Sequence, residues 1–278
     1  MTIREMARSG LPLPIPIIDA HTHIGPQYNA GWHQKPEYTT VEGQLAVYDR
    51  LGVDCCVTAP HEVSSGMMEE ANLAARAAAE RFPDRVYGYI FIAPYDGLEG
   101  CRREQERYRR DPHFLGLKFL GGYNGDYDDP VYQYAADFAD EMRCPVLCHT
   151  WEDSPPIAQT VALARRRPGL KLLAAHQGGG TAQMTRRCAE LMRDVPNVWM
   201  ELCGSLNNTL GMAEILELVG EDRMIFGSDM TDLDVRYDFG RVALAPISDD
   251  AKKKIFAENF LRLLETSQMG TIRRMPVK

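Results

Sequence analysis

The stretch Ile17–Gly25, with the sequence IIDAHTHIG, bears most directly on the fold of this chain. It is a short apolar run that ends in two histidines separated by one residue, just before a glycine. Because successive side chains of a strand point to opposite faces, a strand here places His21 and His23 on the same side. Two imidazoles on one face suit a divalent metal ion, and simple hydrogen bonding at a strand end is the alternative.

Short apolar runs alternate with amphipathic helical segments along the rest of the chain. The runs are almost continuously apolar, as expected of parallel strands that are buried on both faces. We predict strands over Ile15–His23, Asp54–Pro60, Val86–Ala93, Leu115–Phe119, Pro145–His149, Leu170–His176, Val198–Leu202 and Met224–Ser228. We predict helices over Glu69–Phe82, Leu98–Arg109, Pro130–Met142, Ile157–Arg167, Ala182–Arg193 and Met212–Val219. Glycine or proline breakers mark the ends of several of these helices.

Eight strands with intervening helices and no break in composition predict a (β/α)8 TIM barrel, with residues 1–278 in a single domain. A doubly wound open sheet is the alternative. However, Gly178-Gly179-Gly180 does not match the dinucleotide motif G-x-G-x-x-G, and no phosphate-binding G-x-x-x-x-G-K-[ST] motif occurs. We expect residues 1–12 and 268–278 to be loose tails.

The composition narrows the range of partners. Hydrophobic residues make up 45% of the chain and charged residues 25%, as in an ordinary globular protein. The net charge of −8 and the isoelectric point near 5.4 argue against nucleic acid or an anionic membrane as a partner. No apolar run is long enough to cross a bilayer, and the first ten residues lack the apolar core of a signal peptide.

The cysteines indicate the cellular compartment of the protein, and one predicted helix face bears on whether the protein forms a dimer. The seven cysteines are scattered and include no C-x-x-C pair, which indicates reduced thiols and a cytoplasmic protein. The alanine-rich segment Ala71–Ala79 presents an apolar face that either supports a homodimer or packs against the barrel.

Polar residues that are unusual in buried strands lie at the carboxyl ends of several predicted strands. They are His21, His23, Lys118, His149, His176 and Asp229. The carboxyl ends of barrel strands converge at one end of the barrel, where barrel enzymes carry their active sites. Four histidines and a carboxylate at equivalent places therefore predict a metal site.

At these residues the chain resembles the amidohydrolase superfamily. It is most similar to the branch that includes aminocarboxymuconate-semialdehyde decarboxylase, resorcylate-type decarboxylases and several lactone hydrolases. The resemblance extends from Ile17 to about Leu264. It rests on the segments Ile18–His23 (IDAHTH), Gly116–Lys118 (GLK), Cys148-His149, Ala175-His176, Phe226–Asp229 (FGSD) and Ile255–Leu264.

This resemblance implies a site with a single divalent metal ion. Its ligands would be His21, His23, His149 and Asp229, with water completing the coordination. His176 and Asp229 would take part in proton transfer. Zinc is the expected ion because three imidazoles and a carboxylate suit it, and manganese or another first-row ion is the alternative.

Lys118 allows a second arrangement. In other branches of the superfamily a carboxylated lysine on the fourth strand bridges two metal ions, and His176 would then become a ligand of the second ion. The Gly-Leu-Lys context is more similar to the branch with one metal, in which the lysine remains a cation beside the substrate. A lysine that extends to solvent from a strand end is the structural alternative.

Loop residues indicate the kind of substrate. Lys118, Arg236 and His61 are candidates for binding a carboxylate, and Trp32 and Trp151 for contacting a ring. The same aromatic residues commonly pack loops together. We therefore expect a small carboxylated substrate, cyclic or aromatic.

Two reactions fit such a site. In hydrolysis, a metal-bound water attacks the carbonyl of a small carboxylated lactone, ester or amide. In non-oxidative decarboxylation, carbon dioxide leaves an aromatic or unsaturated acid and a proton takes its place. Many resorcylate-type decarboxylases carry Glu-x-His on the first strand, where this chain has His21-x-His23, so we predict hydrolysis with decarboxylation as the alternative. A non-catalytic metal-binding barrel is a further alternative.

Overall fold

The structure is a computed structural model, and it describes residues 1–25, 39–151, 157–204 and 209–272. Eight parallel strands form one sheet in the order β1 to β8. Backbone bonds from Ala20 N to Phe226 O (3.1 Å) and from Asp229 N to His21 O (2.8 Å) join the last strand to the first. The predicted single-domain (β/α)8 barrel is confirmed, and the consecutive strand order excludes the doubly wound sheet.

The strands lie where the apolar runs predict them, although most are shorter. They are β1 Ile18–Thr22, β2 Cys55–Thr58, β3 Val86–Ile92, β4 Phe114–Phe119, β5 Pro145–Cys148, β6 Lys171–Ala174, β7 Val198–Glu201 and β8 Met224–Ile225. Nearly every strand residue is buried, because helices cover the outside of the barrel and side chains fill its interior.

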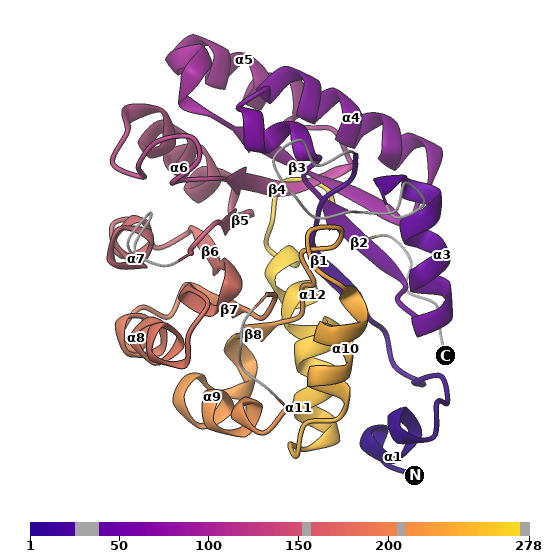
Figure 1. The fold of residues 1–278 in the computed structure, drawn as a ribbon. Helices are drawn as coiled ribbons and strands as arrows, with labels where there is room; N and C mark the ends of the chain where they lie inside the picture. The colour runs from indigo at the N-terminus through magenta and orange to yellow at the C-terminus, as the bar shows by residue number, and fades with distance from the viewer. Residues whose placement is uncertain (26–38, 152–156, 205–208, 273–278) are drawn as a thin grey trace.

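The helices surround the sheet in chain order (Figure 1). They are α3 Val41–Leu51, α4 Met68–Arg81, α5 Gly97–Tyr108, α6 Pro130–Met142, α7 Ile157–Arg165, α8 Ala182–Met192, α9 Gly211–Val219 and α10 Val235–Ala243. Helices α3 and α10 were not predicted from the sequence pattern. The alanine face of α4 is buried in the chain's own core beside β3, so this face packs against the barrel.

The interior of the barrel is closed at its lower end, where the strands begin. Helix α11 (Asp249–Lys253) leads through a π-helical turn into α12 (Asn259–Leu264). Phe260, Leu263 and Leu264 pack in one cluster with the interior residues of the strands, such as Ile18 and Leu173. This apolar plug leaves the opposite end of the barrel as the place for polar side chains.

The two ends of the chain, which we expect from the sequence to be loose, make contacts with the rest of the chain where the structure describes them. Helix α1 (Ile3–Arg8) begins with a capping box at Thr2 and lies beside α10 and α11, where the Ile3 amide bonds to Asp249. At the other end, Gly270 N donates to Phe114 O, and Ile272 joins the interior cluster. Buried apolar contacts therefore hold both segments in place. Residues 273–278 lie outside the described residues.

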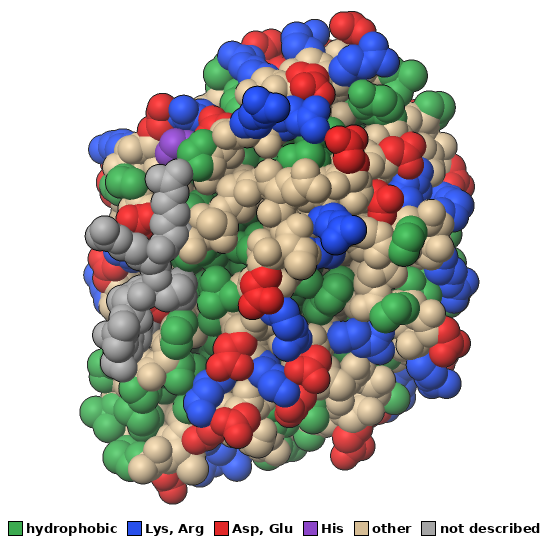
Figure 2. Space-filling view, turned by 180° about the vertical axis from the view of Figure 1, so that it is seen from behind, with side chains coloured by type: hydrophobic (Ala, Val, Ile, Leu, Met, Phe, Trp, Pro, Cys, Tyr) green, Lys and Arg blue, Asp and Glu red, His purple; other side chains and the backbone are tan. Residues whose placement is uncertain are grey.

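The surface and the cysteines add two observations. Acidic and basic side chains are interspersed on the face shown in Figure 2. All seven cysteines are buried and none forms a disulfide. Within the described ranges, no helix is both long and apolar enough to cross a membrane.

Candidate metal centre

The polar side chains predicted to form a site meet at the carboxyl ends of the strands. His21 belongs to β1, Lys118 to β4, and His149 directly follows β5. His176 lies in a short helical turn after β6, and Asp229 lies in the loop after β8. His176 and Asp229 both adopt positive φ angles, 56° and 57°, which turn the chain sharply where each strand ends.

An irregularity in β1 brings His21 into the barrel. Ile18 and Ala20 face the interior, so strict alternation would leave His21 on the outer face. Between the pairs Asp19–Cys56 and Thr22–Thr58, β1 contains one residue more than β2. Such a bulge reverses the facing of the residues that follow it.

A similar bulge in β4 changes the direction in which the Lys118 side chain faces. The register pairs Gly88 with Phe114 but Tyr89 with Gly116, so β4 has an extra residue there. It allows Leu115 to face the interior while Lys118, three residues later, reaches the site.

Two imidazole nitrogens converge on one carboxylate oxygen. The Nε2 atoms of His21 and His23 each lie 3.1 Å from Oδ1 of Asp229. The other ring nitrogens face acceptors: His21 Nδ1 lies 3.0 Å from Glu201 Oε2, and His23 Nδ1 lies 2.5 Å from Ala59 O. If each Nδ1 carries the proton, both Nε2 lone pairs point at a carboxylate. A cation between these three atoms resolves that arrangement, and so would a proton on Asp229, because burial raises the pKa of this carboxyl well above its ordinary value. The donor set therefore fits a divalent metal, which would take the place of that proton.

The protonation states agree with a metal site. Burial lowers the pKa of His21 well below its ordinary value, with Lys118 adding to the effect. Burial likewise lowers the pKa of His23 and of His149 to about 3. These rings are therefore neutral, which is the form that binds metal ions.

The predicted ligand His149 lies somewhat apart from this cluster. Its Nδ1 is 3.1 Å from His176 Nε2, and the two rings meet edge to face with centroids 4.8 Å apart. Among the described residues, two groups have possible ligand atoms within 4.8 Å of one another. One is His21, His176, Cys203 and Asp229, and the other is His23, Asp229 and Asp232. The role of His149 as a ligand therefore stays a prediction.

Three residues of the site escaped the sequence prediction. Glu201 ends β7, Cys203 follows it, and Asp232 lies in the loop after β8. Glu201 Oε2 and Cys203 Sγ both contact Nδ1 of His21, at 3.0 and 3.2 Å. The sequence did contain a signal, because Glu-x-Cys lies at the end of the seventh strand as His-x-His lies at the first.

Lys118 is a fully buried cation. Its Nζ lies 2.9 Å from His21 Nε2 and its side chain is inaccessible to solvent. In the part of the chain that the structure describes, no carboxylate lies within ion-pair distance of this ammonium group. Burial lowers the pKa of Lys118, while the more distant Asp229 raises it. A buried cation without a direct counter-ion leaves room for an anionic ligand.

The remaining predicted substrate residues differ in position. The ring of His61 stacks on His23, and its nitrogens bond to Gly25 O (2.7 Å) and Asp232 Oδ1 (2.8 Å), so both are occupied. Arg236 begins the exposed face of α10 and is paired with Asp234.

Trp151 and Tyr123 are partly exposed at the site. Trp151 is 36% exposed and meets the His176 ring edge to face at 5.2 Å. Tyr123, from the loop after β4, meets His149 in the same way at 5.4 Å. Trp32 lies outside the described residues.

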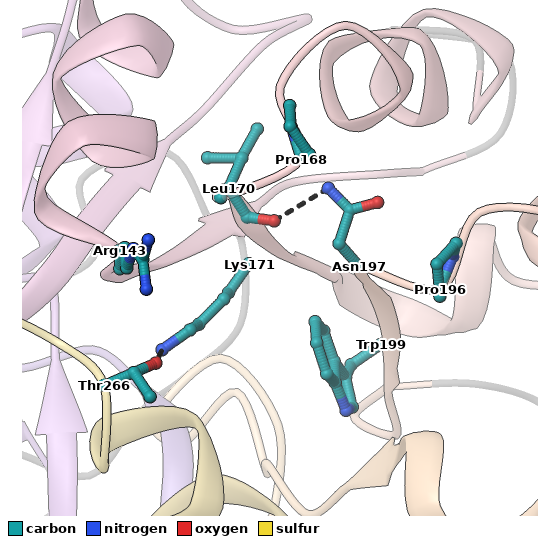
Figure 3. Close-up of a pocket in the computed structure, with 9 residues that line it drawn as sticks. Arg143, Pro168, Leu170, Lys171, Pro196, Asn197, Trp199 and Thr266 are labelled. Carbon is teal, nitrogen blue, oxygen red and sulfur yellow. Dashed lines mark hydrogen bonds between the residues drawn. The ribbon is translucent and has the colours of Figure 1, made fainter.

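A separate hollow of about 470 Å³ opens at the lower end of the barrel (Figure 3). Arg143, Lys171, Asn197 and Trp199 are among the residues that line it. Lys171 Nζ lies 2.7 Å from Thr266 Oγ1 and also bonds to Leu263 O, so its charge is already solvated by the protein. This hollow therefore differs from the site around Lys118.

A parallel barrel with buried imidazoles and a carboxylate at the carboxyl ends of its strands is the architecture of a metal-dependent barrel enzyme. Residues 18–266 match the family model described as Amidohydrolase, and the chain belongs to this family. The family assignment favours an enzyme over the non-catalytic barrel. Comparison with curated protein sequences gave no significant match.

Several solved structures share the fold. A dihydroxybenzoic acid decarboxylase from Polaromonas sp. JS666, with bound manganese and 2-nitroresorcinol, has a TM-score of 0.76 at 16% identity, covering 90% of this chain and 97% of that one. A 5-carboxyvanillate decarboxylase from Novosphingobium aromaticivorans, also with manganese, has a TM-score of 0.70 at 16% identity, covering 90% and 96%. A 4-oxalomesaconate hydratase from Rhodopseudomonas palustris has a TM-score of 0.67 at 19% identity, covering 89% and 95%.

These comparisons bear on the choice of metal. A single divalent ion, zinc or manganese, is consistent with the His and Asp cluster and with the manganese named for two of the similar structures. Nothing selects zinc, which was the ion expected from the sequence.

Proposed function

We propose that this chain is a metal-dependent decarboxylase of a small carboxylated molecule, aromatic or unsaturated. The observation that carries the proposal is Lys118, a fully buried ammonium group at the site without an ion-paired carboxylate among the described residues. A substrate carboxylate would supply the missing counter-charge in a desolvated position, where such a pair contributes strongly to binding.

The similar structures support this choice of substrate and reaction. Two of them are described as decarboxylases of dihydroxybenzoic acid and 5-carboxyvanillate, both of which are carboxylated rings. The exposed edges of Trp151 and Tyr123 lie beside His176 and His149 and offer apolar surface to such a ring. The hydrolysis predicted from the sequence has support only at the level of the family, so it becomes the second candidate.

We assign the metal to His21, His23 and Asp229, whose donor atoms converge, with His149 as the further predicted ligand. A bound divalent ion would polarise a substrate oxygen and stabilise negative charge that develops during the reaction. Glu201 and Ala59 O hold the two first-strand rings in the orientation that this binding requires.

Decarboxylation also requires a proton. The bond between the carbon and the departing carboxylate breaks, its electron pair stays on that carbon, and a proton then replaces carbon dioxide. We assign proton transfer to His176 and Asp229, as the resemblance implies, because both lie within the cluster around His21. The protein must therefore hold the carboxylate of the substrate near Lys118. The carbon that receives the proton must lie near His176 and Asp229.

The test is a substrate screen on protein loaded with zinc or with manganese. The panel contains hydroxylated benzoic acids, unsaturated dicarboxylic acids and, as the competing class, carboxylated lactones and esters. We expect release of carbon dioxide and, in deuterium oxide, one deuterium on the carbon that lost it. Hydrolysis of a lactone or ester, with no carbon dioxide released from any acid, would contradict the proposal and support the second candidate.

The matched pair of variants Lys118→Met and Lys171→Met sharpens this screen. Both changes remove a lysine charge from a β strand, but only Lys118 lies at the site. We expect decarboxylation to depend on Lys118 and to be unchanged by the substitution of Lys171.

A further inference from the structure

Glu201 is a buried carboxylate that receives several donors at the end of β7. Its Oε2 lies 3.0 Å from His21 Nδ1 and accepts from the His176 amide at 3.3 Å. Its Oε1 accepts from the Cys203 amide at 2.7 Å. Burial raises the pKa of the Glu201 carboxyl to about 7, while the bonds from Cys203 and the His176 amide favour its ionised form. In that form the carboxylate accepts and cannot donate, so the proton in its contact with His21 belongs to Nδ1 of the ring. This assigns the Nε2 lone pair of His21 to the side that faces Asp229.

The thiol of Cys203 continues the contact from Glu201 to a second histidine. Its Sγ donates to Glu201 Oε2 at 2.9 Å and lies 3.1 Å from His176 Nδ1. A thiol has one proton, and here it is directed to the carboxylate. The sulfur is then the acceptor in its contact with His176, so that ring carries its proton on Nδ1.

The same reasoning reaches a third histidine. His176 Nε2 lies 3.1 Å from His149 Nδ1. With its proton on Nδ1, His176 has a lone pair on Nε2 and accepts from His149. His149 therefore carries its own proton on Nδ1, and Nε2 is its lone-pair atom, free of a proton.

We propose that Glu201 and Cys203 form a positioning relay that sets the tautomers of His21, His176 and His149. The relay leaves Nε2 unprotonated in both His21 and His149, which is the form that a metal ligand needs. The Glu201 carboxylate on β7 thereby sets the protonation of one ligand on β1, His21, and of one directly after β5, His149. The proposal rests on the metal role proposed for His21 and His149, and it holds for either reaction.

Two glycines without a Cβ atom leave space for the side chains of the relay. A Cβ at Gly227 on the neighbouring loop would lie 2.2 Å from Glu201 Oε1 and 2.8 Å from the Cβ of His21. A Cβ at Gly204, whose φ is +64°, would lie 3.1 Å from His176 Nδ1. Side chains at these two positions would therefore crowd the atoms through which the relay acts.

A different interpretation of the same residues makes Cys203 a metal ligand. His21, His176, Cys203 and Asp229 have possible ligand atoms within 4.8 Å of one another. That interpretation requires the thiol to give its proton to a base or to water and bind the ion as a thiolate, and it requires His176 to turn an Nδ1 lone pair towards the ion. The two arrangements place the histidine protons differently, so they can be distinguished directly.

The experiment is to locate the ring protons by NMR on protein labelled with ¹⁵N only in histidine. It uses the zinc-loaded protein, because zinc is diamagnetic, and also the metal-free protein. Signals are assigned with His149→Gln and His176→Gln. In both samples of the wild type we expect His21, His149 and His176 to carry their protons on Nδ1. A proton on Nε2 of His149 would overturn the relay without any variant being needed.

Two substitutions of Cys203 then test causation. In Cys203→Ala we expect His21 to keep its Nδ1 proton while His176 and His149 become mixtures of tautomers, with zinc affinity lowered about 10-fold. Cys203→Ser should restore the wild-type tautomers, because a hydroxyl also donates and accepts. The matched control is Cys101→Ala, a buried thiol on α5 that lies outside the site, which should leave both readouts unchanged.

Two results would contradict the proposal. One is an unchanged pair of His176 and His149 tautomers in Cys203→Ala. The other is a sulfur-to-metal charge-transfer band in cobalt-loaded wild type that disappears in Cys203→Ser, because this would identify Cys203 as a ligand. A chain that binds no metal but keeps the expected tautomers would instead refute the proposed function and leave the relay intact.

Discussion

The two ends of the barrel differ in whether a lysine ammonium group has bonding partners within the protein. At the lower end, α12 fills the interior with Phe260, Leu263 and Leu264, and the charge of Lys171 is bonded to Leu263 O and Thr266. At the upper end, Lys118 is buried without an ion-paired carboxylate among the described residues, beside neutral imidazoles.

This difference separates stability from function. At the lower end, the ammonium group of Lys171 has partners within the protein, so its bonds stabilise the fold. The polar groups around Lys118 lack partners that a metal ion and an anionic substrate would supply. Such groups commonly lower the stability of a protein and are retained because activity requires them. The two ends should therefore respond differently to the same kind of substitution.

The largest effect is expected from His21→Ala at the upper end. The substitution removes one of the two imidazoles that converge on Asp229, so the metal should be lost. If the metal contributes about 4 kcal/mol to transition-state stabilisation, kcat/KM falls about 1,000-fold. Elemental mass spectrometry and turnover measure the two losses. A full equivalent of retained metal would show that His21 is not a ligand.

Lys118→Met should change activity and stability in opposite directions. Loss of a desolvated charge pair with the substrate should cost about 3 kcal/mol, which lowers kcat/KM about 100-fold for carboxylated substrates. The melting temperature should rise, since an incompletely paired buried cation is replaced by an apolar side chain of similar length. Steady-state kinetics and calorimetry test this. Unchanged kinetics would remove the main support for a carboxylated substrate.

Lys171→Met at the lower end should show the reverse pattern. Its ammonium group loses the bonds to Leu263 O and Thr266, and we expect about 1 kcal/mol of destabilisation. For a chain of this size that lowers the melting temperature by about 2–4 °C, with kcat/KM unchanged. A clear loss of turnover in a folded variant would mean that the two ends are coupled.

Arg236→Ala should have the smallest effect. Arg236 was predicted from the sequence to bind substrate, but its exposed side chain is paired with Asp234, the residue that caps the N-terminus of α10. Removal of an exposed ion pair changes the free energy of unfolding by less than about 1 kcal/mol. Urea unfolding and the KM for the best carboxylated substrate should both match the wild type. A rise in KM would show that Arg236 reaches the substrate after all.

Much of this molecule is predictable from local patterns. Buried parallel strands produce continuous apolar runs, and the segments before His23 and around Leu117 are recognisable for that reason. The barrel in turn predicts that His21, His149 and Asp229 lie at the same end, because parallel strands share one direction. Helices α3 and α10 were missed, and so was α1, although its capping box of Thr2 and Glu5 is a local signal for a helix start. The buried contacts of Ile3 then hold α1 against the rest of the chain.

The sequence by itself determined the barrel and the end of it that carries the site, since both follow from the period and order of the strands. Only the tertiary structure decided which atoms meet there. Bulges in β1 and β4 direct His21 and Lys118 inward, and left-handed turns at His176 and Asp229 orient the residues after β6 and β8. These features depend on how neighbouring strands pair, and the contacts of Glu201 and Cys203 join residues that lie far apart in the chain.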